Sequence, residues 1–164
     1  ALSVRTGVII AKKIGAPHNP ERAIGAIAEG NVVKIDDDAL ALFGLDWASL
    51  MPLIEQAQQE LNRQVKLFRP DQARLNKLLD KVVVIVDDGL ATGLTALAAI
   101  ESVKQHNPRE VIVAVPLCAR STVQLLRHEA RVVCLFTPQR LGAIGTYYRQ
   151  FDQVSDQEVV KLLS

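Results

Sequence analysis

Apolar residues change their spacing from segment to segment, and that spacing predicts an order of elements. Thr6–Ala11 is a short, fully apolar run, which is typical of a strand in a sheet covered on both faces. Lys12–Pro20 holds glycine, proline and asparagine residues and predicts a loop. Arg22–Glu29 and Val32–Ile35 are two apolar runs separated by a Gly-Asn pair, which predicts a β-hairpin.

The middle of the chain carries the signatures of two helices. Aspartates stand where side chains cap helix N-termini, and apolar residues follow the second cap at helical spacing. The elements predicted here are a helix over Ala39–Phe43 capped within Asp36–Asp38 and ended by Gly44, a helix from Trp47 to about Lys66 capped by Asp46, and a polar connection over Arg69–Asp80.

The second half alternates between strand and helix. Strands separated by helices imply a parallel sheet with right-handed crossovers, so the expected fold is α/β, in a single domain over residues 1–164. The predicted strands are Val82–Val86, Val111–Val115 and Val132–Phe136, and the predicted helices are Thr95–His106, Thr122–Glu129 and Ser155–Leu163, the last with Ser155 and Glu158 in capping-box spacing.

Composition narrows the functional classes. Hydrophobic residues make up 49% of the chain and the formal net charge is +1, which indicates a folded domain and no nucleic-acid or membrane partner. Cys118 and Cys134 lack metal-ligand spacing and are interpreted as buried free thiols of a cytoplasmic protein. No apolar run is long enough to span a bilayer, and no signal peptide is evident. The chain opens without Met, so we expect a piece of a longer gene product.

The most informative stretch begins where the strand Val82–Val86 ends. Two carboxylates are followed by a tight loop with a glycine and two threonines, and a helix comes next. In doubly wound sheets, ligands bind at the carboxyl ends of strands. The residues expected to bind substrate here are Asp87, Asp88, Gly89, Leu90, Ala91, Thr92, Gly93, Leu94 and Thr95.

The chemistry of this stretch suits a phosphorylated sugar. Backbone N–H groups of the loop ending at Thr95, the helix N-terminus and two threonine hydroxyls form a cradle for one phosphate. Gly93 lets the backbone approach the anion closely. Asp87 and Asp88 can accept hydrogen bonds from sugar hydroxyls and can bind Mg²⁺ or its waters. An acidic turn with a helix cap is the alternative, but the ordered string argues against it.

The string Val84-Ile-Val-Asp-Asp-Gly-Leu-Ala-Thr-Gly-Leu-Thr95 resembles the phosphoribosyl-pyrophosphate motif of type I phosphoribosyltransferases. Lys12–Glu29 and Gly142–Phe151 resemble a bacterial branch of that family with no assigned substrate. The resemblance covers nearly the whole chain and implies a parallel-sheet fold with a small hood and a β-hairpin or flexible loop. It also implies Mg²⁺-dependent transfer of phosphoribose from 5-phosphoribosyl-1-pyrophosphate to a nitrogenous base, with release of pyrophosphate.

The resemblance assigns roles to further residues. The acid pair would bind the ribose hydroxyls, and a loop over about Lys12–Glu29 would close over the reacting centre. Lys12 or Lys13 would face the pyrophosphate, where a cation stabilises the developing charge, although solvated surface charge is the alternative. Asp88 and Glu29 are candidate general bases.

Three features depart from the family pattern. The hood maps to Pro138–Phe151, and Leu141 stands where purine-type members place an aromatic ring, although Tyr147 or Tyr148 could supply one. Ala91 replaces the acid that 6-oxopurine enzymes carry before the Thr-Gly pair. The family's first strand and its pyrophosphate-binding glycine loop have no match near the N-terminus, so we expect an exposed sheet edge and, with it, a homodimer.

Four functions follow from these observations. The first is the phosphoribosyltransferase reaction, with small-molecule substrates only. The second is a non-catalytic module that binds phosphoribosyl pyrophosphate or a nucleotide and regulates a partner. The third is a hydrolase acting on a related phosphorylated sugar. The fourth is a phosphorylated receiver domain, but after Asp88 no further acid ends a predicted strand, as such domains require.

Overall fold

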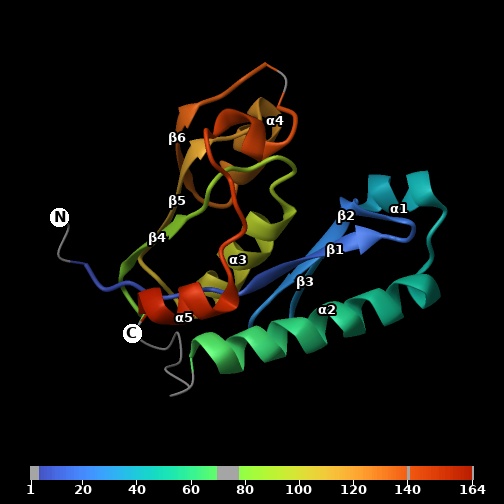
Figure 1. Ribbon diagram of the computed structural model, residues 1–164, viewed down its shortest axis with the longest axis horizontal. Helices are drawn as coiled ribbons and strands as arrows, with labels where there is room; N and C mark the ends of the chain where they lie inside the picture. The colour runs from blue at the N-terminus through green and yellow to red at the C-terminus, as the bar shows by residue number, and fades with distance from the viewer. Residues whose placement is uncertain (1–3, 70–77, 140, 164) are drawn as a thin grey trace.

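The computed structural model describes residues 4–69, 78–139 and 141–163, and two sheets form its framework (Figure 1). One sheet is antiparallel and the other parallel, and each has three strands. The antiparallel sheet has the order β1 (Ala11–Ala16), β2 (Asn19–Ala28) and β3 (Val32–Ile35). The parallel sheet has the order β4 (Val82–Val86), β5 (Glu110–Leu117) and β6 (Arg131–Phe136).

The first strand lies later in the sequence than predicted. Residues 4–10 are not strand, and β1 begins at Ala11, where the predicted strand was to end. The loop predicted over Lys12–Pro20 is instead most of a second hairpin, because β1 pairs with β2 and satisfies the backbone groups. Gly15 lies at a register shift, and a Cβ there would overlap the backbone of Pro20. The loop-forming residues therefore mark a bulge and a turn. The hairpin between β2 and β3 is confirmed.

Both capped helices are confirmed. Asp36 Oδ1 accepts from the Ala39 N–H at 3.0 Å at the start of α1 (Asp37–Phe43), which ends at Gly44 in the left-handed conformation. Asp46 Oδ1 accepts from the Ser49 N–H at 2.9 Å at the start of α2 (Trp47–Phe68). The apolar stripe of α2 packs along one face of the antiparallel sheet (Figure 1). The polar connection predicted after it lies largely outside the described residues.

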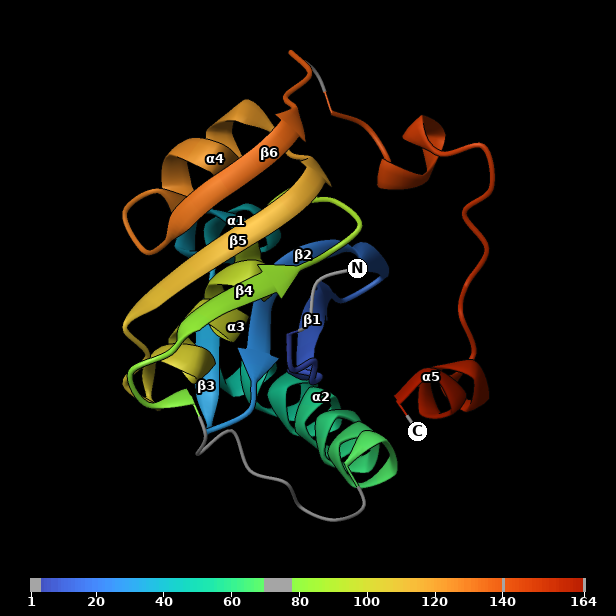
Figure 2. The same cartoon turned by 90° about the vertical axis from the view of Figure 1, so that its left-hand side faces the viewer.

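Helix α3 (Leu94–Lys104) lies between the two sheets in Figure 1 and behind the strands of the parallel sheet in Figure 2. Its buried residues are distributed around the helix, as expected for an element covered on more than one side. Leu94 and Ala98 pack with β2 residues, whereas Ile100 and Val103 pack with β4 and β5. The helix therefore belongs to the cores of both sheets.

The parallel sheet buries only one of its faces. Its inner face packs against α3 and α4 (Arg120–Leu126), with Val113 and Leu126 fully buried. On the outer face, Val84 and Leu135 keep 52% and 85% of their surfaces exposed, so no described element covers that face. Within the described residues β4 forms one edge of this sheet, which agrees with the expected open edge.

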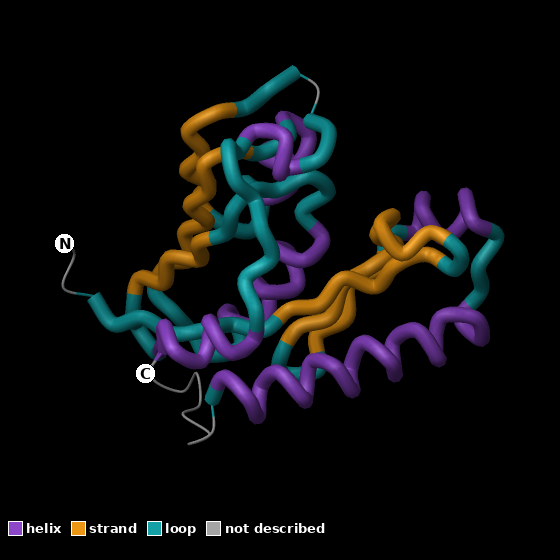
Figure 3. The backbone as a smooth tube through the Cα atoms, in the orientation of Figure 1, coloured by secondary structure: helices purple, strands orange, loops and turns teal. Residues whose placement is uncertain are grey.

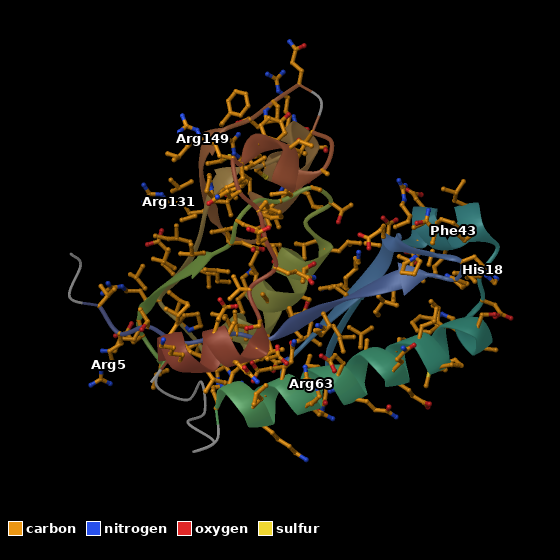
Figure 4. The ribbon with its side chains drawn as sticks, in the orientation of Figure 1. Arg5, His18, Phe43, Arg63, Arg131 and Arg149 are labelled. Atoms are coloured by element: carbon orange, nitrogen blue, oxygen red, sulfur yellow. The ribbon has the colours of Figure 1, made fainter. Side chains whose placement is uncertain are left out.

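A long, mostly irregular arm follows β6 and ends in α5 (Asp156–Leu163), as the tube in Figure 3 shows. The predicted capping box is present: the Ser155 N–H donates to Glu158 Oε2 at 2.8 Å, and the Glu158 N–H donates to Ser155 Oγ at 3.3 Å. Arg63 of α2 pairs with Asp156 at 2.7 Å and fastens α5 to α2 (Figure 4). None of the helices in the described ranges has the length and apolar character needed to cross a bilayer.

Candidate functional site

The carboxyl ends of the three parallel strands bring three segments of the chain together. They are the loop after β4, the turn after β5, and the hood after β6. The Leu90 N–H donates to the Leu117 carbonyl at 3.0 Å, and the Ala119 N–H donates to the Leu90 carbonyl at 2.9 Å. The loop after β4 is thereby fastened to the turn after β5.

Thr122 of α4 holds the middle of that loop. Its hydroxyl donates to the Ala91 carbonyl, and its side chain is 2% exposed. Gly93 has a φ of 79°, and a Cβ at this position would overlap the Thr122 methyl group. The close contact and the left-handed backbone both require glycine, so the loop has a single well-defined path into α3.

The N-terminus of α3 presents backbone donors that no described side chain caps. Gly93 is its N-cap residue and supplies no side-chain hydrogen bond, so the first-turn N–H groups lack intrahelical acceptors. Thr92, which precedes the N-cap, is exposed, and Thr95, in the first turn of α3, is half-buried. A phosphate is the ligand that matches these donors and the positive end of the helix dipole.

Asp87 and Asp88 lie side by side where β4 ends. The Asp88 N–H donates to Asp87 Oδ1 at 2.9 Å. Burial of the carboxyl group raises the pKa of Asp87, the hydrogen bond from Asp88 lowers it, and the neighbouring Asp88 charge raises it again. The described residues contain no cluster of three or more metal-ligating side chains. Two adjacent carboxylates still fit Mg²⁺, which proteins often bind through one or two carboxylates together with substrate phosphates and waters.

The hood contacts the backbone of the acid pair. The Tyr148 hydroxyl donates to the Asp88 carbonyl at 2.6 Å, and Ile144 packs over Gly89. The Tyr148 ring also packs against Phe151, with centroids 5.0 Å apart. Leu141 lies apart from these rings, in the lining of a cavity of about 530 Å³ beside Thr92.

The two lysines of β1 do not act as a pair. Neighbouring side chains of a strand point to opposite faces, so Lys12 shares the α2 face with Ile14, and Lys13 shares the other face with Ala11. Lys13 Nζ pairs with Glu21 Oε2 at 3.2 Å. In the part of the chain that is described, neither lysine forms an ion pair with Asp87 or Asp88. His18 marks the hairpin tip, remote from the parallel sheet (Figure 4).

The Glu29 carboxylate and the Cys118 thiol both lie in surroundings that suit a structural role. Glu29 forms an ion pair with Arg69 and accepts from the Ile10 N–H at 2.8 Å, so this carboxylate joins the segment before β1 to the end of α2. Burial, followed by the charge of Cys134, raises the pKa of Cys118 to about 11. The Cys118 thiol is therefore neutral near pH 7.

Sequence reasoning missed the residues that support the loop. Thr122 was predicted only as a helical residue, and Tyr148 only as a possible stacking ring. Sequence reasoning also did not single out three residues that line the cavity beside Thr92, namely Arg120, Ser121 and Gln124. The one available signal was topological: each of these residues follows the end of a parallel strand, where ligands of such sheets bind.

Comparisons with known proteins agree with this geometry. The model of the phosphoribosyl transferase domain family matches residues 51–149. Two relatives from Mycobacterium tuberculosis strains, "Putative phosphoribosyl transferase MT0597" and "Putative phosphoribosyl transferase Rv0571c", are each 39% identical over 99% of this chain. The chain spans 37% of the length of each. The crystal structure of TT1426 from Thermus thermophilus is 35% identical and superposes with a TM-score of 0.70, over 96% of this chain and 74% of that one.

Proposed function

Because the chain belongs to the phosphoribosyl transferase family, we propose that it transfers phosphoribose from 5-phosphoribosyl-1-pyrophosphate to a nitrogenous base. The observation that carries the proposal is the loop between β4 and α3. There an acid pair and an uncapped helix N-terminus meet at one sheet edge. These groups complement the hydroxyls and the 5′-phosphate of one ribose phosphate.

The proposed step exchanges one bond for another at C1′ of the sugar. A ring nitrogen of the acceptor forms a bond to C1′ with its lone pair. The C1′–O bond breaks, and pyrophosphate leaves with the electrons of that bond. When the acceptor nitrogen carries a proton, Asp88 is our candidate to receive it, because its carboxylate is exposed beside the proposed ribose site.

Cations would favour departure of the polyanionic leaving group. Asp87 and Asp88 would hold Mg²⁺, which when bound would neutralise charge on the pyrophosphate. Lys13 is the better lysine candidate, because it lies on the face of β1 shared with Ala11, which packs against the α3 core. Lys12 faces α2 instead, where its charge helps to lower the pKa of Glu60, after Arg63.

A binding module without turnover is the second candidate. It is favoured because neither lysine contacts the acid pair within the described ranges, whereas the loop around Gly93 is firmly held. The chain also spans 37% of the curated relatives, so a transferase could draw leaving-group contacts from elsewhere. In either case we infer a small-molecule ligand, cytoplasmic location and association through β4. The free thiols agree with a reducing compartment.

Isothermal titration of phosphoribosyl pyrophosphate with Mg²⁺ tests the donor site. The parent chain should bind, and the Asp87→Asn/Asp88→Asn double variant should lose at least about tenfold in affinity, since each carboxylate makes charge-assisted hydrogen bonds. Pyrophosphate release with added bases then separates transferase from binding module.

A matched double variant controls for loss of charge. Asp37→Asn/Asp38→Asn removes the same two charges from the first turn of α1 and leaves the capping residue Asp36 in place. It should bind the donor as the parent does. A folded parent that binds no donor, or equal affinities in the parent and the acid-pair variant, would refute the proposed site.

A further inference from the structure

The cavity beside the loop between β4 and α3, hereafter the phosphate loop, has a polar wall and a single charge among its described lining residues. It measures about 530 Å³ and adjoins Thr92 of the loop. Arg120, Ser121 and Gln124 line it from α4, and Gln139 and Leu141 line it from the hood. An acceptor held here would lie beside the proposed donor phosphate site, and its reacting nitrogen would extend from the cavity toward C1′ of a ribose at the acid pair.

Arg120 gives this cavity a positive character. Among the described residues that line the space it is the one ionisable side chain, and it is exposed. Within the described residues, no carboxylate lies in salt-bridge range of its guanidinium. Ser121, Gln124 and Gln139 are also exposed and offer further donors. A planar guanidinium with free donors recognises a carboxylate through two parallel hydrogen bonds.

Aromatic stacking is not what this cavity offers. Leu141 is the apolar wall contributed by the hood, and none of the described lining residues is aromatic. Tyr148 instead packs on Phe151 and donates to Asp88, while the Tyr147 ring lies 6.0 Å from that of Phe136. Discrimination between ligands must therefore come from charge and hydrogen bonding.

We propose that this cavity binds the acceptor, and that Arg120 selects a nitrogen heterocycle bearing a carboxylate group. This inference rests on the proposed function and specifies its acceptor. The heterocycle would lie between Leu141 and the phosphate loop, with its carboxylate toward Arg120. A neutral heterocycle of the same shape would leave the guanidinium without its partner and would bind more weakly.

Matched pairs of heterocycles test the inference by titration. Orotate and uracil differ by one carboxylate, and nicotinate differs from nicotinamide by the charge of one group. Each is titrated into the full chain saturated with Mg²⁺ and ribose 5-phosphate, which lacks a leaving group and so prevents turnover. The anionic member of at least one pair should bind about tenfold more tightly, in keeping with a charge-assisted hydrogen bond.

Substitutions assign the preference to one residue. Arg120→Gln should reduce the affinity for the anionic heterocycle to that for its neutral counterpart, and Arg120→Lys should retain part of the preference. Arg127→Gln, at the other end of α4, should change nothing. Four outcomes would each overturn the inference. The parent could bind both members of each pair equally, or bind no heterocycle at all. The preference could survive in Arg120→Gln, or that variant could lose ribose 5-phosphate binding. A parent that fails to bind ribose 5-phosphate would instead contradict the proposed function.

Discussion

The two sheets differ in how they arrange their candidate functional residues. The parallel sheet gathers three segments at the carboxyl ends of its strands, and Thr122, Leu117 and Tyr148 hold the phosphate loop from separate elements. The antiparallel sheet displays Lys12 and Lys13 on opposite faces of one strand, and Glu21 pairs with Lys13. One region brings the residues of the proposed binding site together, whereas the other carries cations that lie apart.

If the proposed function holds, donor binding and departure of the leaving group depend on different parts of the molecule. The phosphate loop is fixed by hydrogen bonds and by close packing around Gly93, so it is preorganised for an anion. The lysines could reach a pyrophosphate bound there only if the β1–β2 hairpin moved. Otherwise contacts from another part of the molecule would have to replace them. Four predictions test how separate the two regions are.

The largest effect is expected in the antiparallel core. Ile27 of β2 is fully buried, and Ile27→Ala should lower the free energy of unfolding by about 2–5 kcal/mol. The donor affinity of the folded protein should stay within about twofold, because independent distant sites act additively. Chemical denaturation and donor titration measure the two quantities. A large loss of donor affinity would show that the two regions are coupled.

Thr122 should matter to the parallel half alone. Thr122→Val removes the donor to the Ala91 carbonyl and should cost about 1–3 kcal/mol of stability, with weaker donor binding. Ser102→Ala is the matched control, because its hydroxyl is equally buried but has no hydrogen-bond partner in the described structure. That control should be neutral or slightly stabilising and should bind donor normally. Similar results for both variants would exclude a special role for Thr122.

Asp87 makes donor binding depend on pH. Its pKa is raised in the folded chain, so the carboxylate that we propose to hold Mg²⁺ is lost as pH falls through a range above 3.8. Affinity should fall about tenfold per pH unit below that pKa.

A raised pKa favours the protonated folded state, and this stabilisation disappears as pH rises through the same range, so Asp87→Asn should stabilise the unliganded chain at pH 7. Titration and thermal unfolding across pH test both signs.

Tyr148 should have the smallest effect. Tyr148→Phe keeps the ring beside Phe151 and removes only the hydrogen bond to the Asp88 carbonyl. The expected loss is about 0.5–1.5 kcal/mol, seen mainly as weaker donor binding. Unchanged donor affinity would mean that the hood does not position the acid pair.

Local patterns predicted most elements, because their signals are themselves local. Asp36, Asp46 and Ser155 cap the helices that their spacing indicated, and the strand Val82–Val86 has the predicted bounds. The family motif pointed to the loop now found at the sheet edge. The hairpin of β1 and β2 was missed, because its glycine and prolines resemble loop chemistry and its strands gain stability from non-local pairing.

Supporting contacts of the site could not be read from the sequence. Thr122 lies 31 residues beyond Ala91, and Tyr148 lies 60 residues beyond Asp88. No periodicity encodes pairs so distant. The sequence also did not reveal that the outer face of the parallel sheet is exposed. The valines of β4 that face outward are as apolar as those that face the core, so the residue type does not tell which face is covered.

The position of α3 has a thermodynamic consequence. An anion bound at its N-terminus would stabilise a helix that is shared by the cores of both sheets. At a donor concentration of 100 times Kd, mass action adds about 2.7 kcal/mol to the stability of the folded state. That gain would extend through α3, so amide hydrogens of β2 should exchange more slowly even though β2 contributes no residue to the proposed phosphate site. The helix would distribute the energy of a local binding event over the whole fold.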